Sequence, residues 1–330
     1  MRRVILNNGL TVLYKKKKGN SVTVEVMVNV GSINEEKSQK GISHMIEHLV
    51  FEGTKKRPTG RKIANSIEKL GGEFNAYTTP NRTNYYIKVL NKDFVIAADV
   101  LSDVIFNPLL EKKSFLKERK VVIKEIDLLY DDPRYYQWVL LQGTLFSQHP
   151  VRFPVYGSKK NVMNLSIDEI NEYYEKYYLP KNMVISIVGN VNNWKKTIKK
   201  TFGQIKKNKI KIKNKKFKQV KLKRNVIKKE KRSIANTHLV LGYKTKPRNH
   251  KDSYVLDVID GVLGRGQSGR IFTELREKRG LAYEVSSYHV SDKDYGYFAL
   301  YAIIDKKNVG LVKKLMKKEL NKLLKLDEID

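Results

Sequence analysis

At 330 residues the chain is longer than most single domains, so we expect two domains of roughly 150 residues each. The absence of cysteine excludes disulfides, thiolate zinc sites and cysteine nucleophiles, so any metal site would need His, Asp or Glu ligands. The formal net charge is +32. The first residues lack the apolar core of a secretory leader, and no apolar run is long enough to span a bilayer. We therefore expect a cytoplasmic protein without a membrane partner.

The first half of the chain is predicted to contain both strands and helices. Strands are indicated by period-two alternation or short apolar runs at 3–14, 21–31, 182–191 and on both sides of a turn at Pro80-Asn81. Helices are indicated by apolar periodicity and by flanking Gly, Pro and Asp residues at 40–51, 60–70, 92–105, 109–130, 134–147 and 166–178.

More than half of the charge excess lies in one segment after this region. Between Lys195 and Arg232 the chain has 17 lysines and 2 arginines against one acid, Glu230. Apolar residues alternate with the lysines, but few aromatic side chains are present to stack on bases. This pattern favours a solvated linker at 206–232, with one or two lysine-edged strands, over a nucleic-acid site. We expect no specific nucleic-acid partner, only polyanion binding at low salt.

After the basic segment the order of elements resembles the start of the chain. The predicted order is a strand, two helices, two strands and a helix, at 237–245, 251–263, 270–279, 281–291, 294–304 and 307–326. The sequence thus predicts an α+β fold of two related units, 1–205 and 233–330, each an antiparallel-rich sheet with helices packed on it. Because the second is about half as long as the first, we expect it to be incomplete.

Two of the six histidines lie four residues apart within the pentapeptide HMIEH. Positions i, i+3 and i+4 share one helix face, so His44, Glu47 and His48 point the same way. Two such imidazoles can bind zinc, and a nearby carboxylate can accept the proton of a water whose pKa zinc brings to about 7. This is the inverted zincin order, H-x-x-E-H. The alternative is a surface helix with two histidines and a salt-bridged glutamate.

A zinc site of this kind needs a third protein ligand, and the predicted helix 109–130 offers Glu118 and Glu125. Seven residues are two helical turns, so both carboxylates can face one point. One could bind the metal while the other orients a histidine. The alternative is that both are exposed acids that balance neighbouring lysines. Spacing alone does not decide between these interpretations.

Residues 264–269, GRGQSG, formally fit the pattern G-x-G-x-x-G. A dinucleotide-binding loop needs a strand before it and an acid about twenty residues later. Here a helix is predicted before the loop, so we reject nucleotide binding. The remaining histidines show no paired spacing and are interpreted as structural or exposed: His149, His238, His250 and His289.

Five segments, in this order, resemble the M16 family of metallopeptidases, which includes pitrilysin, insulin-degrading enzyme and mitochondrial processing peptidase. They are GISHMIEHLVFEGTKKRP, LGGEFNAYTTPNRTNYYIKVL, ERKVVIKEI, LPKNMVISIVGNV and GRGQSGRIFTELREKRGLAY. In the family, 76 residues separate the second histidine from the third zinc ligand, and the same count here ends at Glu125. The resemblance implies His44, His48 and Glu125 as ligands of one Zn²⁺ per chain, Glu47 as general base and Glu118 as an assisting acid.

The resemblance also implies residues that bind substrate. Asn75, Ala76 and Tyr77 match an edge strand to which a peptide adds as an extra strand through its backbone. Arg276 and Tyr283 match a pair from the second half that holds the scissile carbonyl and its developing oxyanion. The loop GRGQSG resembles the family's glycine-rich turn between two helices. The second half lacks H-x-x-E-H, as it does in the family, and it is shorter than the family pattern.

The resulting prediction is a zinc-dependent endopeptidase acting on oligopeptides or unfolded, presequence-like segments. The alternative is a catalytically weak or inactive scaffold subunit of a heteromeric M16-type peptidase. A third hypothesis is a polyanion-binding protein. The expected partner is a peptide substrate, and the chain could form a homodimer or a heterodimer with a paralogous subunit.

Overall fold

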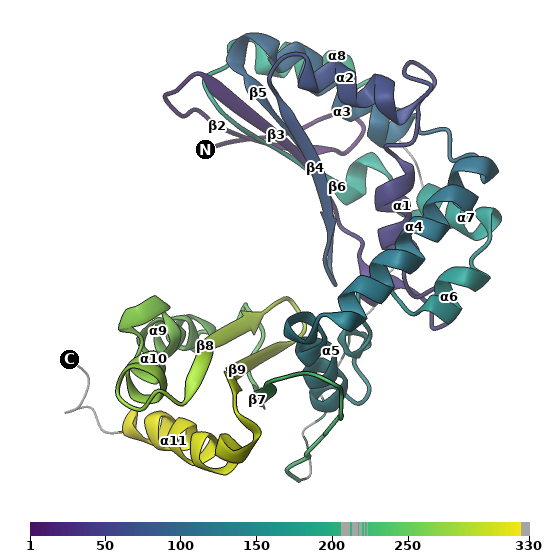
Figure 1. The fold of residues 1–330 in the computed structure, drawn as a ribbon. Helices are drawn as coiled ribbons and strands as arrows, with labels where there is room; N and C mark the ends of the chain where they lie inside the picture. The colour runs from purple at the N-terminus through teal and green to yellow at the C-terminus, as the bar shows by residue number, and fades with distance from the viewer. Residues whose placement is uncertain (206–211, 213–216, 218–219, 221, 223, 325–330) are drawn as a thin grey trace. The chain divides into compact units, whose positions relative to one another are not determined.

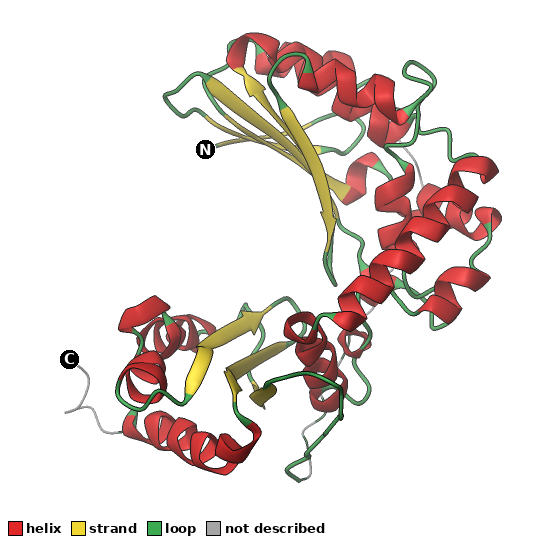
Figure 2. Ribbon diagram, viewed as in Figure 1, coloured by secondary structure: helices red, strands yellow, loops and turns green. Residues whose placement is uncertain are grey.

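The computed structural model describes residues 1–205 and 224–324, together with residues 212, 217, 220 and 222. Helices and strands are mixed throughout (Figure 2), and they form two compact units, 1–127 with 153–215 and 128–152 with 216–330. The predicted α+β class is confirmed. Within the described residues, no helix is long and apolar enough to cross a membrane.

The first unit is built on a six-stranded sheet with the strand order β1-β2-β6-β3-β5-β4. Its strands are β1 (Arg2–Ile5), β2 (Thr11–Lys15), β3 (Ser21–Val28), β4 (Glu73–Thr78), β5 (Thr83–Leu90) and β6 (Met183–Val188). Among the described strands of this sheet, only β2 and β6 pair in parallel. On the central strand β3, alternate valines from Val22 to Val28 are buried, which follows from the period-two direction of strand side chains.

Seven helices are described in this unit, the fourth of which runs past its boundary. They are α1 (Ile42–Leu49), α2 (Gly60–Glu68), α3 (Phe94–Phe106), α4 (Lys112–Asp131), α6 (Lys159–Asn164), α7 (Ile167–Tyr177) and α8 (Trp194–Thr201). The apolar helix α3 packs on β3 and β5, with α2 and α8 beside it (Figure 1). Helix α1 packs against β4, β5 and α7.

Three features of the first unit differ from the sequence prediction. The predicted strand 3–14 is two strands, because Gly9 has φ +90 in a turn that reverses the chain between β1 and β2. The helices α6 and α8 were not predicted. In α8 only Trp194 and Ile198 are buried, and the lysines between them hide this four-residue spacing in the basic segment.

The second unit is built on a three-stranded antiparallel sheet with the order β7-β9-β8: β7 (Thr237–Lys244), β8 (Ala282–Ser291) and β9 (Gly296–Ile304). All nine residues of the central strand β9 are buried. On one face, Tyr297 and Ala299 pack with Leu141 and Leu145 of α5 (Pro133–Leu145). The predicted division placed α5 in the first unit, whereas its packing is with this sheet. The boundaries predicted at 205 and 233 otherwise stay a prediction.

On the other face of the β7-β9-β8 sheet lie α9 (Asp252–Gly264), α10 (Arg270–Phe272) and α11 (Val309–Lys322). The glycine loop 264–269 does follow a helix, as predicted. The predicted helix 270–279 is shorter, because α10 continues as a π-helical turn at Thr273–Glu277. One or two strands were predicted within the linker 206–232. Residues 206–211, 213–216, 218–219, 221 and 223 of this linker lie outside the described residues, and residues 224–232 contain no strand.

Candidate metal centre

Helix α1 presents its polar face to the candidate site because its apolar face lies in the core. Ile42, Met45, Ile46 and Leu49 are buried, whereas the three half-buried residues of α1 are His44, Glu47 and His48. The helix periodicity that placed these three on one face is thereby confirmed.

The first turn of α1 is capped from outside the helix. Its N-cap residue, Gly41, has φ 101 and no side chain that could cap. The buried side chain of Glu35 instead accepts hydrogen bonds from two backbone N–H groups, from Gly41 at Oε2 and from Ser43 at Oε1, each with an N···O distance of 3.0 Å. Both oxygens of Glu35 thus accept hydrogen bonds from N–H groups at the helix N-terminus that lack partners within the helix, so Glu35 fixes the start of the histidine helix.

Three potential ligand atoms from α1 and α4 converge. Nε2 of His48 lies 3.4 Å from Nε2 of His44, and Oε2 of Glu125 lies 3.7 Å from His44 Nε2 and 3.5 Å from His48 Nε2. In a tetrahedral zinc site with ligand bonds of about 2.1 Å, neighbouring ligand atoms are about 3.4 Å apart. The three atoms therefore have the spacing of one face of such a tetrahedron, and two imidazoles with one carboxylate are a donor set that fits zinc.

Glu118 lies on the other side of the His48 ring. Its Oε2 atom is 3.2 Å from Nδ1 of His48, and its side chain is only 9% exposed. Lys117 Nζ lies 3.3 Å from Oε1 of Glu118 and 2.7 Å from Glu52. Glu118 is therefore not simply an exposed acid balanced by a lysine, because it also contacts a histidine from inside the fold.

The electrostatics of the cluster keep one histidine neutral. Burial, and then the charge of His48, lower the pKa of His44 to about 4, against the attraction of Glu125. Burial also lowers the pKa of His48, but its hydrogen bonds with Glu125 and Glu118 outweigh this and the net shift is upward. The hydrogen bond from His48 holds the pKa of Glu125 below its usual value. A neutral imidazole beside an ionised carboxylate is the protonation state that metal binding requires.

Glu47 lies beside these atoms and contacts the sheet. The Thr78 hydroxyl at the end of β4 donates a hydrogen bond to Oε2 of Glu47. Burial raises the pKa of Glu47, while this hydrogen bond acts in the opposite direction. The side-chain contact between Thr78 and Glu47 has no signal in the local sequence, because the two residues are 31 positions apart.

Comparison with known proteins places these features in a family. Residues 11–159 match the family model described as insulinase (peptidase family M16), and residues 164–329 match the model described as the peptidase M16 inactive domain. The chain belongs to peptidase family M16. The two models together extend over both units, so the membership does not rest on the histidine motif alone.

Relatives of this M16 chain are named as zinc proteases. The uncharacterized zinc protease YmxG of Bacillus subtilis is 34% identical over 91% of this chain and 70% of its own length. An uncharacterized zinc protease of Rickettsia felis is 31% identical over 96% of this chain and 77% of its own length. The crystal structure of a protease from Helicobacter pylori, 29% identical, superposes with a TM-score of 0.91 over 98% of this chain and 79% of that one.

In this M16 chain the predicted substrate strand is an edge of the first sheet. Within the described residues, β4 pairs with no strand other than β5, and the Ala76 N–H donates to Oδ1 of its neighbour Asn75 at 2.8 Å. Asn75 and Tyr77 are exposed on the sheet face opposite to Ala76 and Thr78, and Tyr77 donates a hydrogen bond to Glu25. The edge position is compatible with strand addition, and the roles of Asn75, Ala76 and Tyr77 stay a prediction.

Arg276 and Tyr283 lie together in the second unit. The Arg276 guanidinium is 5.9 Å from the centre of the Tyr283 ring and 5.1 Å from that of Phe272. Tyr283 is 68% exposed, which is unusual for a large aromatic residue on a strand. The ring of Tyr283 is therefore not part of the core of this unit. The role of both residues in substrate binding stays a prediction.

Proposed function

We propose that this M16 chain is a zinc endopeptidase that hydrolyses peptide bonds in oligopeptides or unfolded, presequence-like segments. The observation that carries the proposal is the triangle formed by Nε2 of His44, Nε2 of His48 and Oε2 of Glu125, with sides of 3.4, 3.5 and 3.7 Å, beside the Glu47 carboxylate. In this proposal the triangle holds one zinc ion per chain, and Glu118 orients His48.

The chemistry divides between the metal and the protein. A zinc ion in this site would supply Lewis acidity, polarising a carbonyl and making water acidic near neutral pH. Glu47 accepts a proton as water attacks the peptide carbonyl, and it returns a proton to the leaving amine as the C–N bond breaks. Burial raises the pKa of Glu47, which makes its carboxylate a stronger base for the first of these two proton transfers.

The proposed substrate lies along the free edge of β4, paired through its backbone. Main-chain hydrogen bonds do not distinguish side chains, so this mode suits a peptidase that accepts many sequences. Thr78 belongs to the same strand and holds Oε2 of Glu47, so the strand that binds the peptide also orients the base. Arg276 and Tyr283 are proposed as further substrate-binding residues, for the carbonyl and its developing negative charge.

The proposal is tested with the variant Glu47→Gln, which keeps the size of the side chain but cannot accept a proton. We expect wild-type zinc content and a fall of about 100-fold or more in cleavage of a quenched peptide. His44→Ala should lose zinc and activity together. The control is Glu68→Gln at the exposed end of α2, which should keep both. Undiminished cleavage by Glu47→Gln would contradict the mechanism, and zinc binding without any turnover by wild type would favour the scaffold subunit.

A further inference from the structure

We infer that Asp103 is a positioning residue for the proposed metal site, because it joins the loop that follows the histidine helix α1 to the segment that leads into the glutamate helix α4. The inference rests on the proposed function, since it concerns the distance between the two histidines and Glu125. Asp103 lies on α3, touches none of the proposed ligands and would act only through the backbone segments that it connects.

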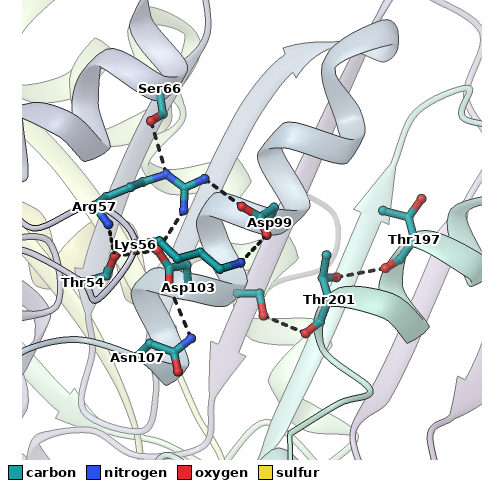
Figure 3. Close-up of polar contacts among 10 residues, drawn as sticks. Thr54, Lys56, Arg57, Ser66, Asp99, Asp103, Asn107, Thr197 and Thr201 are labelled. Atoms are coloured by element: carbon teal, nitrogen blue, oxygen red, sulfur yellow. Dashed lines mark hydrogen bonds and ion pairs between the residues drawn. The ribbon is translucent and has the colours of Figure 1, made fainter.

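Asp103 is the centre of a buried polar network (Figure 3). Only 1% of its side chain is exposed. Its Oδ2 atom accepts hydrogen bonds from the Thr54 hydroxyl at 2.5 Å and from the Arg57 guanidinium at 2.8 Å, and its Oδ1 atom accepts one from the Asn107 amide at 3.3 Å. Thr54 and Arg57 belong to the loop after α1, whereas Asn107 is the C-cap residue of α3, four residues after Asp103. The Asp103 carboxylate therefore binds the loop after α1 to the end of α3, from which the chain continues into the segment before α4.

The same two segments are also paired through their backbones. Leu109 N–H donates to the Gly53 carbonyl at 2.9 Å, and Thr54 forms an isolated antiparallel bridge with Pro108. A side chain at Gly53 would collide with the Pro58 carbonyl, so the loop can take this tight path only with glycine. Gly53 lies five residues after His48, and Leu109 lies three residues before α4 begins.

A second link joins α1 and α4 closer to the ligands. Glu52, in the same loop, binds Lys117 at 2.7 Å, and Lys117 also contacts Glu118 at 3.3 Å. Glu118 in turn contacts His48. Because Lys117 and Glu52 are partly exposed, this outer link is screened by solvent, whereas the Asp103 network is buried and geometrically fixed.

The network acts on metal binding because the ligand atoms come from both of the helices that it joins. A shift of the loop after α1 relative to the segment before α4 changes the separation of the histidine nitrogens from Glu125. Zinc tolerates little variation in its ligand distances, and loss of a supporting contact typically weakens metal affinity by about 10- to 100-fold. If the network only stabilised the fold, its loss would lower the melting temperature without changing the zinc affinity.

The experiment compares Thr54→Val with Thr54→Ser in the full chain. Valine has the shape of threonine but cannot donate to Asp103, whereas serine keeps the donor and loses a methyl group. We expect Thr54→Val to weaken zinc affinity by about 10-fold or more in competition with a chelator, and to change the visible absorption of the Co²⁺-substituted protein. Thr54→Ser should keep the wild-type affinity and spectrum. Asp103→Asn should show the larger loss where it folds.

Asp99→Asn is the matched control at the outer end of the network. Asp99 is 36% exposed and binds Lys56 at 2.9 Å and Arg57 at 2.7 Å, without touching Thr54. It should lower the melting temperature of the metal-free protein while leaving zinc affinity unchanged. Wild-type zinc affinity and spectrum in Thr54→Val, measured well below its melting temperature, would overturn the positioning role alone. Absence of zinc binding by the wild-type protein would overturn both this inference and the proposed function.

Discussion

Nδ1 of His48 lies 3.2 Å from Oε2 of Glu118, on the side of the imidazole ring opposite the nitrogen that lies 3.5 Å from Glu125. A carboxylate at Nδ1 favours the tautomer with its proton on that nitrogen, which leaves the lone pair of Nε2 free. The two glutamates of α4 therefore have different roles in the proposed site. Glu125 is placed to bind the metal, and Glu118 is placed to fix the ring that binds it.

The first prediction concerns this division between the glutamates. Glu118→Gln can still accept a hydrogen bond from His48 but loses the negative charge, so we expect zinc affinity to fall by about 10- to 100-fold. Glu125→Gln should abolish tight zinc binding, because it removes a ligand. Chelator competition measures both, with Asp131→Asn at the exposed end of α4 as the control. Unchanged zinc affinity in Glu118→Gln, together with slower turnover, would instead assign Glu118 a direct part in the reaction.

The second prediction concerns the buried cap of α1. Burial raises the pKa of Glu35 from 4.5 to about 7, against the charge of Lys40 and the hydrogen bonds from Gly41 and Ser43. At pH values between 4.5 and 7 the folded protein holds a proton on Glu35 that the unfolded chain has released, so the free energy of unfolding falls as pH rises. We expect the contribution of Glu35 to the free energy of unfolding to decrease by up to about 3 kcal/mol between pH 4.5 and 7, and to change little above pH 7.

Glu35→Gln tests this, because an amide does not titrate. The measured quantity is the free energy of unfolding of the wild type minus that of Glu35→Gln, from urea denaturation with chelator present to remove pH-dependent metal binding. The difference should decline from pH 5 to pH 8. Glu172→Gln, an exposed acid of α7, should show no such trend. A difference that is constant with pH would show that Glu35 is already ionised in the folded protein at pH 5.

The third prediction concerns Tyr283 in the second unit. If its hydroxyl stabilises the developing oxyanion, Tyr283→Phe should lower kcat by about 100-fold and leave zinc content unchanged. The exposed ring packs little, so the melting temperature should also stay unchanged. Tyr243→Phe is the matched control, because Tyr243 is a strand tyrosine of the same unit that is 41% exposed. Equal activity of the two variants would remove Tyr283 from the proposed reaction.

The sequence predicted those parts of the site that follow from one helix, and it did not predict contacts between distant elements. His44, Glu47 and His48 share a face because of helix periodicity alone. The position of Glu125 beside them required the family spacing, since spacing along α4 left Glu118 equally plausible. The bond from Thr78 to Glu47 and the burial of Asp103 depend on how a strand and a helix pack against α1 and its loop, and neither has a periodic signal.

The α+β class was predicted correctly, but the packing of one helix and the limits of one strand were not, for a related reason. The apolar pattern of α5 identifies a helix but not the sheet that it covers, so the structure was needed to place Leu141 and Leu145 against β9. In the stretch 3–14 the apolar alternation continues through a turn, because the even spacing of Leu6 and Leu10 fits one continuous strand as well as two strands joined by a turn. The left-handed backbone at Gly9, with φ +90, makes the turn, and the sequence shows only that a glycine there can adopt this conformation.

The last prediction concerns the loop GRGQSG, whose first glycine is explained by packing and not by phosphate binding. Gly264 ends α9 where the helix crosses β8, and a Cβ atom there would collide with the backbone nitrogen and the hydroxyl of Ser287. The Gly264 carbonyl also accepts a hydrogen bond from Ser286 at 2.8 Å, so the helix cannot move away without losing this contact. We expect Gly264→Ala to lower the free energy of unfolding by about 1–3 kcal/mol.

Gly261→Ala is the matched comparison, three residues earlier in the same helix. A Cβ atom at Gly261 meets no neighbour within 4 Å, so alanine adds only helix propensity and should raise the free energy of unfolding by about 0.5–1 kcal/mol. The two substitutions are chemically identical and differ only in their surroundings, so opposite signs in urea denaturation would isolate the contact with β8. If both variants were stabilised, the close approach of α9 to Ser287 would be wrong, and the need for glycine at position 264 would require another explanation.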